Sequence, residues 1–250
     1  MAAASGAKRA RTDETSAEGP IVLSSYWRSS CSWRVRICLA LKGIEYEYIP
    51  VHLLNDGGEQ LKLEYSAKNP MKELPCLEID GLKLGQSMAI IQYLEETRPG
   101  VSPLLPEAPV ARYRVRQICD SITQDTQPVQ NLRVLKKVMG FFEGEEKDKH
   151  KLEWGKWAIE LGFDGVEKML ETSAGKYCVG DSVSFADLVL VPQVYNAKRF
   201  GVDLSKYPII VRVDAELTKL EAFQKAHPDA MPDAVKAVAP APAPAAEEGK

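Results

Sequence analysis

The residues best suited to chemistry in this chain are the serines and the cysteine of Ser29-Ser30-Cys31-Ser32. The apolar, β-branched stretch 21–25 before them predicts a buried strand, and the apolar spacing after them predicts a helix. The cluster therefore lies at the start of a helix, where backbone amides have no intrahelical partner and the helix dipole is positive. A thiolate at such a position is stabilised, so that its pKa falls.

The stabilised thiolate could belong to Cys31 itself or to a bound thiol compound. No second cysteine follows two or three residues later, so a thioredoxin-type disulfide cycle is not available. A serine Oγ–H can donate to a sulfur anion, and capping the helix would need only one of the serines. These features favour the sulfur of bound glutathione over that of Cys31.

Strands and helices alternate in the first half of the chain. Residues 45–51 alternate in polarity and predict a second strand, and Pro50 favours the edge of a sheet. Asp80-Gly81 lies between two alternating segments and predicts a β-hairpin. The order is strand, helix, strand, helix, strand, strand, helix, over residues 21–25, 29–42, 45–51, 58–67, 76–79, 82–84 and 87–97. This order predicts an α/β thioredoxin-like domain.

Two further places in this half could bind parts of a peptide. In thioredoxin-like folds a proline at the position of Leu74-Pro75 is cis, and the backbone of its neighbour faces the ligand. We therefore expect a cis bond here, although an ordinary trans proline opening a strand is the commoner case in general. Gln86-Ser87 opens the last helix, where a hydroxyl, an amide and free N–H groups suit a carboxylate, although such a pair is usually only a cap.

The second half of the chain is predicted to be all-helical. Prolines mark residues 99–109 as a linker between domains over 20–98 and 110–236. An apolar row at helical spacing favours core packing of its two tryptophans over an aromatic ligand site; its members are Trp154, Trp157, Ala158 and Leu161, with Val166, Met169 and Leu170 beyond. Ser184 and Asp187 fit a capping box better than Asp187 fits a catalytic acid. Residues 1–19 and 237–250 are predicted to be disordered.

Composition narrows the class of protein. The formal net charge is -3, which gives no general reason to expect nucleic acid as a partner. No apolar run approaches the length of a membrane helix, and no secretory signal is recognisable. The short basic cluster at Lys8-Arg9 and Arg11 is more typical of a solvated tail than of a nuclear signal. The five cysteines are widely spaced, which argues against a disulfide framework and against a zinc site. This use of cysteine favours a reducing compartment, and so a cytoplasmic location.

Motifs along the chain resemble those of the zeta-class glutathione transferases, in the same order from about residue 21 to residue 223. The Ser-Ser-Cys signature is quite specific for the class, whereas the box Ala186-Asp187-Leu188 indicates only the superfamily. The resemblance implies a thioredoxin-like domain joined to a helical bundle, working as a homodimer with glutathione as its cofactor. The motifs lie at residues 29–37, 39–44, 69–72, 86–87, 127–132, 178–181, 186–188, 191–193 and 199–200.

The resemblance also implies roles for single residues. Ser29, as first choice, and Ser30 would stabilise the thiolate, with Cys31 close by as a helper. Arg199 matches a position proposed to bind a substrate carboxylate. Arg133 departs from the family, because a smaller residue is common there. The other residues that the resemblance assigns to glutathione are Ser32, Trp33, Arg34, Gln60, Leu74, Pro75, Gln86, Ser87, Gln127, Asn131, Leu132 and Arg133.

The reaction implied by the resemblance is cis–trans isomerisation of maleylacetoacetate to fumarylacetoacetate in tyrosine and phenylalanine catabolism, with transferase activity on α-haloacids. One alternative is thiol transfer or reductive dehalogenation with Cys31 as the nucleophile. Another is a non-catalytic ligand-binding protein on the same fold, because a fold does not determine a function. Replacing Cys31 distinguishes the first alternative, which predicts complete loss of activity, from the isomerase hypothesis, which predicts partial retention.

Overall fold

Four short strands form one mixed sheet in the computed structural model, which describes residues 19–99 and 102–235. Strand β1 (Val22–Ser25) pairs in parallel with β2 (Glu47–Pro50) and antiparallel with β3 (Cys76–Ile79), which forms a hairpin with β4 (Leu82–Gly85). The strand order β2-β1-β3-β4 places β2 at an edge, where Pro50 costs no ladder hydrogen bond. The thioredoxin-like arrangement predicted from the sequence is confirmed.

The hairpin turn and the end of the first helix use the predicted residues. Asp80 and Gly81 have φ values of 52° and 72°, as a type I′ turn requires. Gly43 has φ 64° just after helix α1 (Ser30–Leu41), where a left-handed residue ends a helix. The Asp-Gly pair therefore sets the register between β3 and β4.

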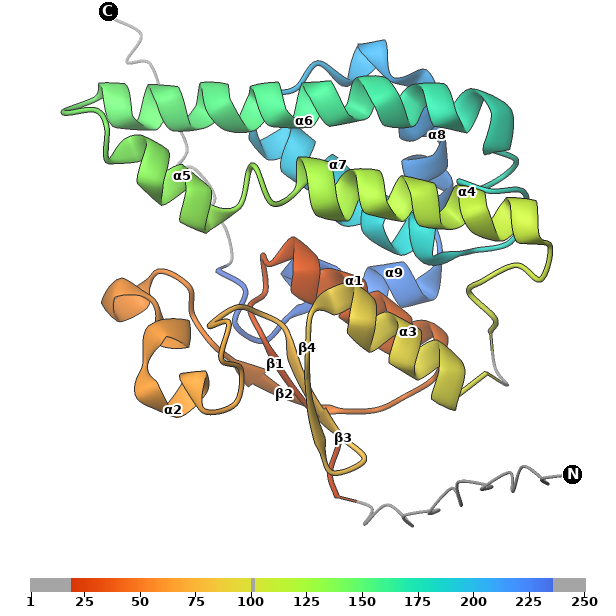
Figure 1. Ribbon diagram of the computed structural model, residues 1–250, viewed down its shortest axis with the longest axis horizontal. Helices are drawn as coiled ribbons and strands as arrows, with labels where there is room; N and C mark the ends of the chain where they lie inside the picture. The colour runs from red at the N-terminus through yellow and green to blue at the C-terminus, as the bar shows by residue number, and fades with distance from the viewer. Residues whose placement is uncertain (1–18, 100–101, 236–250) are drawn as a thin grey trace, which may run out of the picture.

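Helix α1 and helix α3 (Ser87–Thr97) lie between the sheet and the helices of the second half (Figure 1). The continuous helix predicted over residues 58–67 is wrong. A 3-10 turn, Asn55–Gly57, precedes this segment, which itself forms a second 3-10 turn, Glu59–Leu61, followed by the single turn α2 (Leu63–Ser66). Gly58, with φ 120°, and Lys62, with an extended ψ of 150°, interrupt the helical backbone.

The second half is all-helical, as predicted. Helix α4 begins at Pro109, a favoured first position for proline, and continues into a π-helical turn, Ser121–Thr126. The long helix α6 runs along the outside of the molecule, and α7 lies between it and α1 (Figure 1). The helices are α4 (Pro109–Asp120), α5 (Leu132–Met139), α6 (Glu146–Ser173), α7 (Phe185–Arg199), α8 (Pro208–Leu217) and α9 (Glu221–Lys225).

The capping box that opens α7 is confirmed. The Asp187 carboxylate is fully buried and accepts hydrogen bonds from the Ser184 amide at 2.7 Å and the Ser184 hydroxyl at 2.9 Å. Its second oxygen accepts from the Cys178 amide at 2.9 Å. Burial raises the pKa of Asp187, and these hydrogen bonds oppose that rise. Asp187 is therefore a structural residue whose oxygens are already occupied.

The expectation that the tryptophans of α6 belong to the core is wrong. Trp154 is 36% exposed, Trp157 52% and Leu161 63%. The buried face of α6 is offset by about one position and carries Ala158, Ile159, Phe163, Val166 and Leu170. The predicted apolar row meets this face at Ala158, Val166 and Leu170, whereas Trp154, Trp157 and Leu161 lie beside it on the exposed side of the helix.

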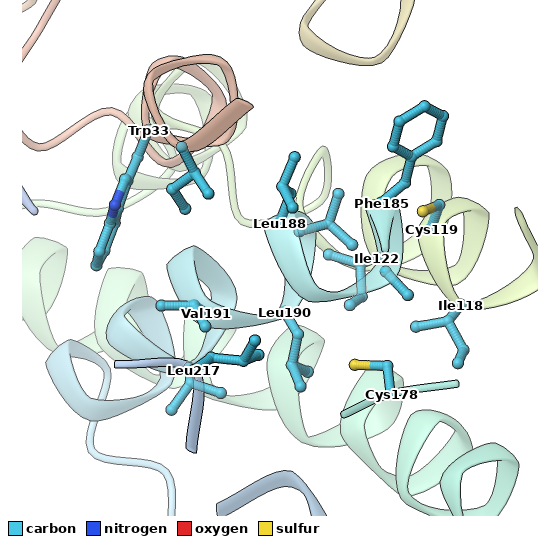
Figure 2. Close-up of a cluster of buried hydrophobic side chains, with 14 of the residues drawn as sticks. Trp33, Ile118, Cys119, Ile122, Cys178, Phe185, Leu188, Leu190, Val191 and Leu217 are labelled. Atoms are coloured by element: carbon cyan, nitrogen blue, oxygen red, sulfur yellow. The ribbon is translucent and has the colours of Figure 1, made fainter. Parts of the chain in front are cut away.

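One continuous hydrophobic cluster joins the two halves of the chain. Trp33 from α1 lies beside Leu188 and Val191 of α7, and Phe185 lies close to Cys119 of α4 (Figure 2). A smaller, separate cluster lies at the other end of the sheet, comprising Tyr26, Trp27, Val51, Tyr65, Leu74 and Cys76. The first half is therefore not packed as an independent unit.

Other expectations concern membrane segments, disulfides and metal sites. None of the helices in residues 19–99 and 102–235 has the length and apolarity needed to cross a membrane. All five cysteines are free, as predicted. The described residues contain no cluster of His, Cys, Asp and Glu side chains that could hold a metal ion. The terminal segments predicted to be disordered lie, except for Gly19, outside the described residues.

Candidate functional site

The turn before α1 places Ser29 at the N-cap. Its Oγ accepts a hydrogen bond from the Ser32 amide at 3.2 Å, and its own amide donates to the Tyr26 carbonyl at 2.9 Å. The Ser29 hydroxyl hydrogen stays available, because the cap uses only a lone pair of the oxygen. Ser30 and Cys31 occupy the first turn, with Ser30 buried and Cys31 half-buried. Ser29 can therefore cap the helix and donate to an anion at the same time.

Arg34 is a buried cation without a carboxylate partner among the described residues. Its side chain is almost fully buried, and Nη1 lies 3.3 Å from Ser87 Oγ and 3.8 Å from Cys31 Sγ. Its Nε and Nη2 have no hydrogen-bond partner among the described residues. A buried, unpaired charge is costly, so these atoms indicate a place for an anionic ligand. Arg34 links the starts of α1 and α3 at this place.

The start of α3 carries a strained backbone residue. Gln86 has φ 65° and ψ 109°, a conformation that residues other than glycine rarely adopt. Ser87, the first residue of α3, is buried, while the Gln86 side chain is exposed. The free N–H groups of the first turn of α3, together with Ser87 and Arg34, form a receptor suited to a carboxylate.

The segment before β3 offers backbone groups and an amide. The Leu74–Pro75 bond is cis, as predicted, and Leu74 makes no backbone hydrogen bond with another described residue. Gln60 is buried, and its Oε1 has no partner among the described residues. Gly58 has φ 120°, and a Cβ there would lie 2.7 Å from Gln60 Oε1. A glycine at this position therefore leaves the space that the Gln60 amide occupies.

Helix α5 brings residues of the second half to the same region. Asn131 caps α5 through a hydrogen bond from the Arg133 amide at 3.3 Å, with Leu132 next to it partly buried. Arg133 forms an ion pair with Glu73 at 2.8 Å, directly before Leu74-Pro75. Gln127, also predicted for the site, is buried at the end of the π-helical turn. The unusual Arg133 thus joins the two halves at the edge of the site.

Two predicted site residues face away from this group. The Ser32 side chain is completely buried, and its amide already donates to Ser29. Trp33 is 3% exposed and packs edge-on against Tyr195, at 5.5 Å between ring centroids, and against His227, at 5.1 Å. The Trp33 ring extends toward α7 (Figure 2). The side chains of Ser32 and Trp33 therefore belong to the packing of α1.

A second arginine accompanies Arg199. The exposed Arg199 side chain, in the last turn of α7, lies 3.4 Å from Asn196 Oδ1. Desolvation by the surrounding protein lowers the pKa of Arg199, and the positive charge of Arg28 lowers it further. Neither Arg28 nor Arg199 has a carboxylate partner in the described part of the chain. Arg28 was missed in the sequence, although its place directly before Ser29 was a usable signal.

Cys31 is the only cysteine with an accessible thiol. The other four are buried. Burial raises the pKa of Cys38 to about 12, and it also raises the pKa of Cys76, Cys119 and Cys178. These buried thiols therefore stay protonated, and thiol chemistry by the chain itself could come only from Cys31.

Two family models match the chain. Residues 28–97 match "Glutathione S-transferase, N-terminal domain", and residues 134–225 match "Glutathione S-transferase, C-terminal domain". The maleylacetoacetate isomerase of Rattus norvegicus is 54% identical over 86% of this chain and 95% of its own length. That of Dictyostelium discoideum is 54% identical over 87% of this chain and 97% of its own length.

Solved structures agree with these relatives. A bacterial maleylpyruvate isomerase, described as a zeta-class glutathione transferase, has a TM-score of 0.81 at 41% identity and covers 86% of this chain and 100% of its own. The maleylacetoacetate isomerase of Anaeromyxobacter dehalogenans with bound glutathione has a TM-score of 0.76 at 44% identity, covering 86% and 98%. The chain therefore belongs to the glutathione transferase family, and to its zeta class.

Proposed function

We propose that this protein is a glutathione-dependent isomerase that converts maleylacetoacetate to fumarylacetoacetate. The observation that carries the proposal is the combination of Ser29 at the N-terminus of α1 with arginines that lack carboxylate partners among the described residues. The first feature suits a thiolate, and the second suits the carboxylates of glutathione, at Arg34, and of a substrate, at Arg28 and Arg199. Relatives that are 54% identical bear the name maleylacetoacetate isomerase, which supports this choice of substrate.

The residues of the first half fit glutathione. Arg34 and Ser87 would hold the γ-glutamyl carboxylate, with the strained Gln86 beside them. Leu74, beside cis-Pro75, would pair with the peptide backbone, and the unpartnered amide oxygen of Gln60 would accept from it. When bound, glutathione supplies a thiolate that can add reversibly to a conjugated double bond, so that this bond can rotate. Gln127 and residues 131–133 would border the ligand from the second half.

Ser29 has the central role in this proposal. Its hydroxyl would donate to the sulfur anion while the positive end of α1 stabilises the charge. Cys31, half-buried and 3.8 Å from Arg34 Nη1, would be a neighbour of the sulfur rather than the nucleophile. Ser30 would support the same turn. These separate roles predict that the isomerase activity depends strongly on Ser29 and is partly retained when Cys31 is replaced.

The substrate carboxylates would meet Arg199 and Arg28. Both guanidinium groups donate several hydrogen bonds in a plane, which matches a carboxylate. Desolvation, and after it repulsion from Arg28, lowers the pKa of Arg199, and an anion bound between or beside the two arginines would relieve this repulsion. The same pair would accept the single carboxylate of an α-haloacid, so transferase activity on such compounds belongs to the proposal.

The experiment that tests the function follows the loss of maleylacetoacetate absorbance and identifies the product, with and without glutathione. We expect fast, glutathione-dependent formation of fumarylacetoacetate, a loss of about 100-fold or more in Ser29→Ala, and substantial activity in Ser29→Thr. Cys31→Ala should keep part of the activity. Ser205→Ala, which removes an exposed hydroxyl on the helical half, is the control. Glutathione binding without isomerisation, or complete loss in Cys31→Ala, would overturn the proposal.

The proposal extends to the assembly and the location of the protein. We propose a homodimer in the cytoplasm, with the chain divided into domains over 20–98 and 110–236. Free cysteines fit a reducing compartment. Exposed apolar residues such as Val110 and Tyr113 on α4 fit a surface that a second copy covers. Analytical ultracentrifugation at micromolar concentration should give twice the chain mass, and a monomer at all concentrations would contradict the dimer.

A further inference from the structure

The chain returns to the first half after α9, through residues 226–235, which we call the C-terminal segment. The Ala226 carbonyl accepts a hydrogen bond from Arg36 Nε of α1 at 3.1 Å. Met231 and Ala234 pack against the small cluster that contains Tyr26 and Trp27. In Figure 1 this part of the chain, in blue, reaches the region where β1 leads into α1. The C-terminal segment therefore contacts the turn that carries Ser29.

Asp233 makes the most direct of these contacts. Its Oδ2 accepts from the Trp27 amide at 3.0 Å, and its Oδ1 accepts from the Tyr48 hydroxyl at 2.7 Å. On the other side, the fully buried Arg36 donates to the Trp27 carbonyl at 2.9 Å and to the Tyr26 carbonyl at 3.3 Å. Both backbone polar groups of Trp27 are thus held by charged side chains, one from α1 and one from the C-terminal segment.

Trp27 directly precedes Arg28 and Ser29. The turn closes through the hydrogen bond from the Ser29 amide to the Tyr26 carbonyl, which is also an acceptor for Arg36. A shift of the Trp27 amide would therefore move the serine hydroxyl and the Arg28 guanidinium together. Hydrogen bonds to ionised groups are stronger than neutral ones, so the Asp233 carboxylate restrains this movement more than a neutral acceptor would.

We propose that Asp233 is a positioning residue that fixes the turn of residues 26–29 and thereby directs the Ser29 hydroxyl toward the sulfur of bound glutathione. The inference rests on the proposed role of Ser29. Asp233 itself contacts neither ligand, because its two oxygens are occupied by Trp27 and Tyr48. A residue near the end of the described chain thus acts on chemistry at the start of α1.

The test compares Asp233→Asn with Tyr48→Phe. The asparagine keeps the size of the side chain but loses the charge, and its NH2 group would face one of the two donors. Tyr48→Phe removes only the tyrosine bond and leaves the Trp27 bond in place, so it is the matched control for anchoring of the C-terminal segment. Asp233→Glu, which keeps the charge, is the conservative variant and should recover part of any loss.

The first readout is the pKa of glutathione in its complex with each protein, followed through the ultraviolet absorbance of the thiolate against pH. We expect Asp233→Asn to raise this pKa by about one unit and to lower kcat about tenfold, with little change in KM for the diacid. Tyr48→Phe should leave both values close to those of the natural chain. Equal effects in the two variants, or no effect in Asp233→Asn, would overturn the inference.

The second readout does not need glutathione. Hydrogen exchange of the amides in residues 27–29 reports the turn itself, and protection there should fall in Asp233→Asn but not in Tyr48→Phe. Unchanged protection would overturn the inference even if Asp233→Asn lost activity. If the natural chain gave no thiolate signal with glutathione, the proposed function would fail instead, and the exchange data would still decide the role of Asp233 in the turn. Circular dichroism confirms that each variant is folded.

Discussion

At the scale of single residues, this site is defined by arginines that lack carboxylate partners within the described residues. Arg34 is buried with two nitrogens unpartnered, and desolvation together with the nearby charge of Arg28 lowers the pKa of Arg199. A protein gains nothing in stability from such charges, since each buried or crowded cation costs free energy. Their presence is explained when ligands bring the missing carboxylates.

Replacing Arg199 by glutamine should weaken the interaction with the substrate rather than the binding of glutathione. We expect kcat/KM for the diacid to fall about 10- to 100-fold, because the substitution removes a hydrogen bond to a charged group, which contributes about 1.5–3 kcal/mol. The Kd of glutathione should not change. Arg199→Lys should fall less, because it keeps the charge but loses the planar pair of donors. Steady-state kinetics and calorimetry measure the two quantities.

Lys83→Gln removes an exposed cation from β4 and serves as the control for a general electrostatic effect. If it reduced kcat/KM as much as Arg199→Gln, steering by overall charge would replace direct contact as the explanation. An equal loss of glutathione affinity in Arg199→Gln would place this arginine at the cofactor instead.

The sequence predicted the serines of this site better than the arginines that surround them. Ser29 and Ser87 could be named because helix starts have local signals, whereas Arg34 was assigned from the motif; the structure places Arg34 against both helix starts, through Ser87 and through Cys31. Arg28 was missed because its proximity to Arg199 depends on how α7 packs against the first half. Ser32 and Trp33 were assigned from the motif alone, and only the orientation of α1 shows that their side chains face inward.

At the scale of elements, Gly57 and Gly58, which follow each other at the end of the first 3-10 turn, differ in which atoms a side chain at each position would meet. Gly58→Ala places a Cβ 2.7 Å from Gln60 Oε1, in addition to strain at φ 120°. Gly57→Ala has comparable strain at φ 81° but meets no atom within 4 Å. Both should lose about 1–3 kcal/mol of unfolding free energy, but only Gly58→Ala should weaken glutathione binding, several-fold by calorimetry. Equal binding in the two variants would remove Gln60 from the site.

The hairpin turn is joined to α3 by Asp80, and this gives a prediction about acid stability. Asp80 pairs with Arg98 at 2.7 Å and accepts from the Tyr93 hydroxyl at 2.6 Å. The hydrogen bond from Arg98 lowers the pKa of Asp80 below its ordinary 3.8, and Tyr93 adds to this lowering. Because the pKa is depressed in the folded state, the carboxylate stabilises the fold above the ordinary pKa and loses this effect as the pH falls through the folded value.

Asp80→Asn should therefore cost about 1 kcal/mol at neutral pH, and this difference should vanish toward about pH 2. Asparagine tolerates the left-handed backbone of this position, so the turn itself is preserved. Urea unfolding of both proteins across this pH range measures the difference. A constant difference at all pH values would mean that the substitution acts on the turn and not through the charge.

Local signals explain which elements could be predicted. The Asp-Gly turn and the start of α3 depend on neighbouring residues, and the structure has both as expected. The broken segment 55–66 and the rim of α6 depend on tertiary packing. No local pattern shows that Trp154 and Trp157 would miss the buried face by one position.

At the scale of the whole molecule, the shared core predicts that both halves unfold together. Leu188 of α7 is completely buried in the cluster that α1 and α7 share (Figure 2). Leu188→Ala should cost about 2–5 kcal/mol and keep a single unfolding transition. Leu161→Ala, at a position 63% exposed on α6, should change the free energy of unfolding by no more than about 0.5 kcal/mol. Two separate transitions in calorimetry would show that the halves are independent.

The placement of the four tryptophans has a practical consequence. Trp27 and Trp33 are buried next to the turn that carries Ser29, whereas Trp154 and Trp157 are 36% and 52% exposed on α6. A water-soluble quencher such as iodide should suppress the fluorescence of Trp154 and Trp157 and leave the fluorescence of Trp27 and Trp33 largely unchanged. The remaining tryptophan fluorescence then reports structural changes and ligand binding at the start of α1, without any attached dye.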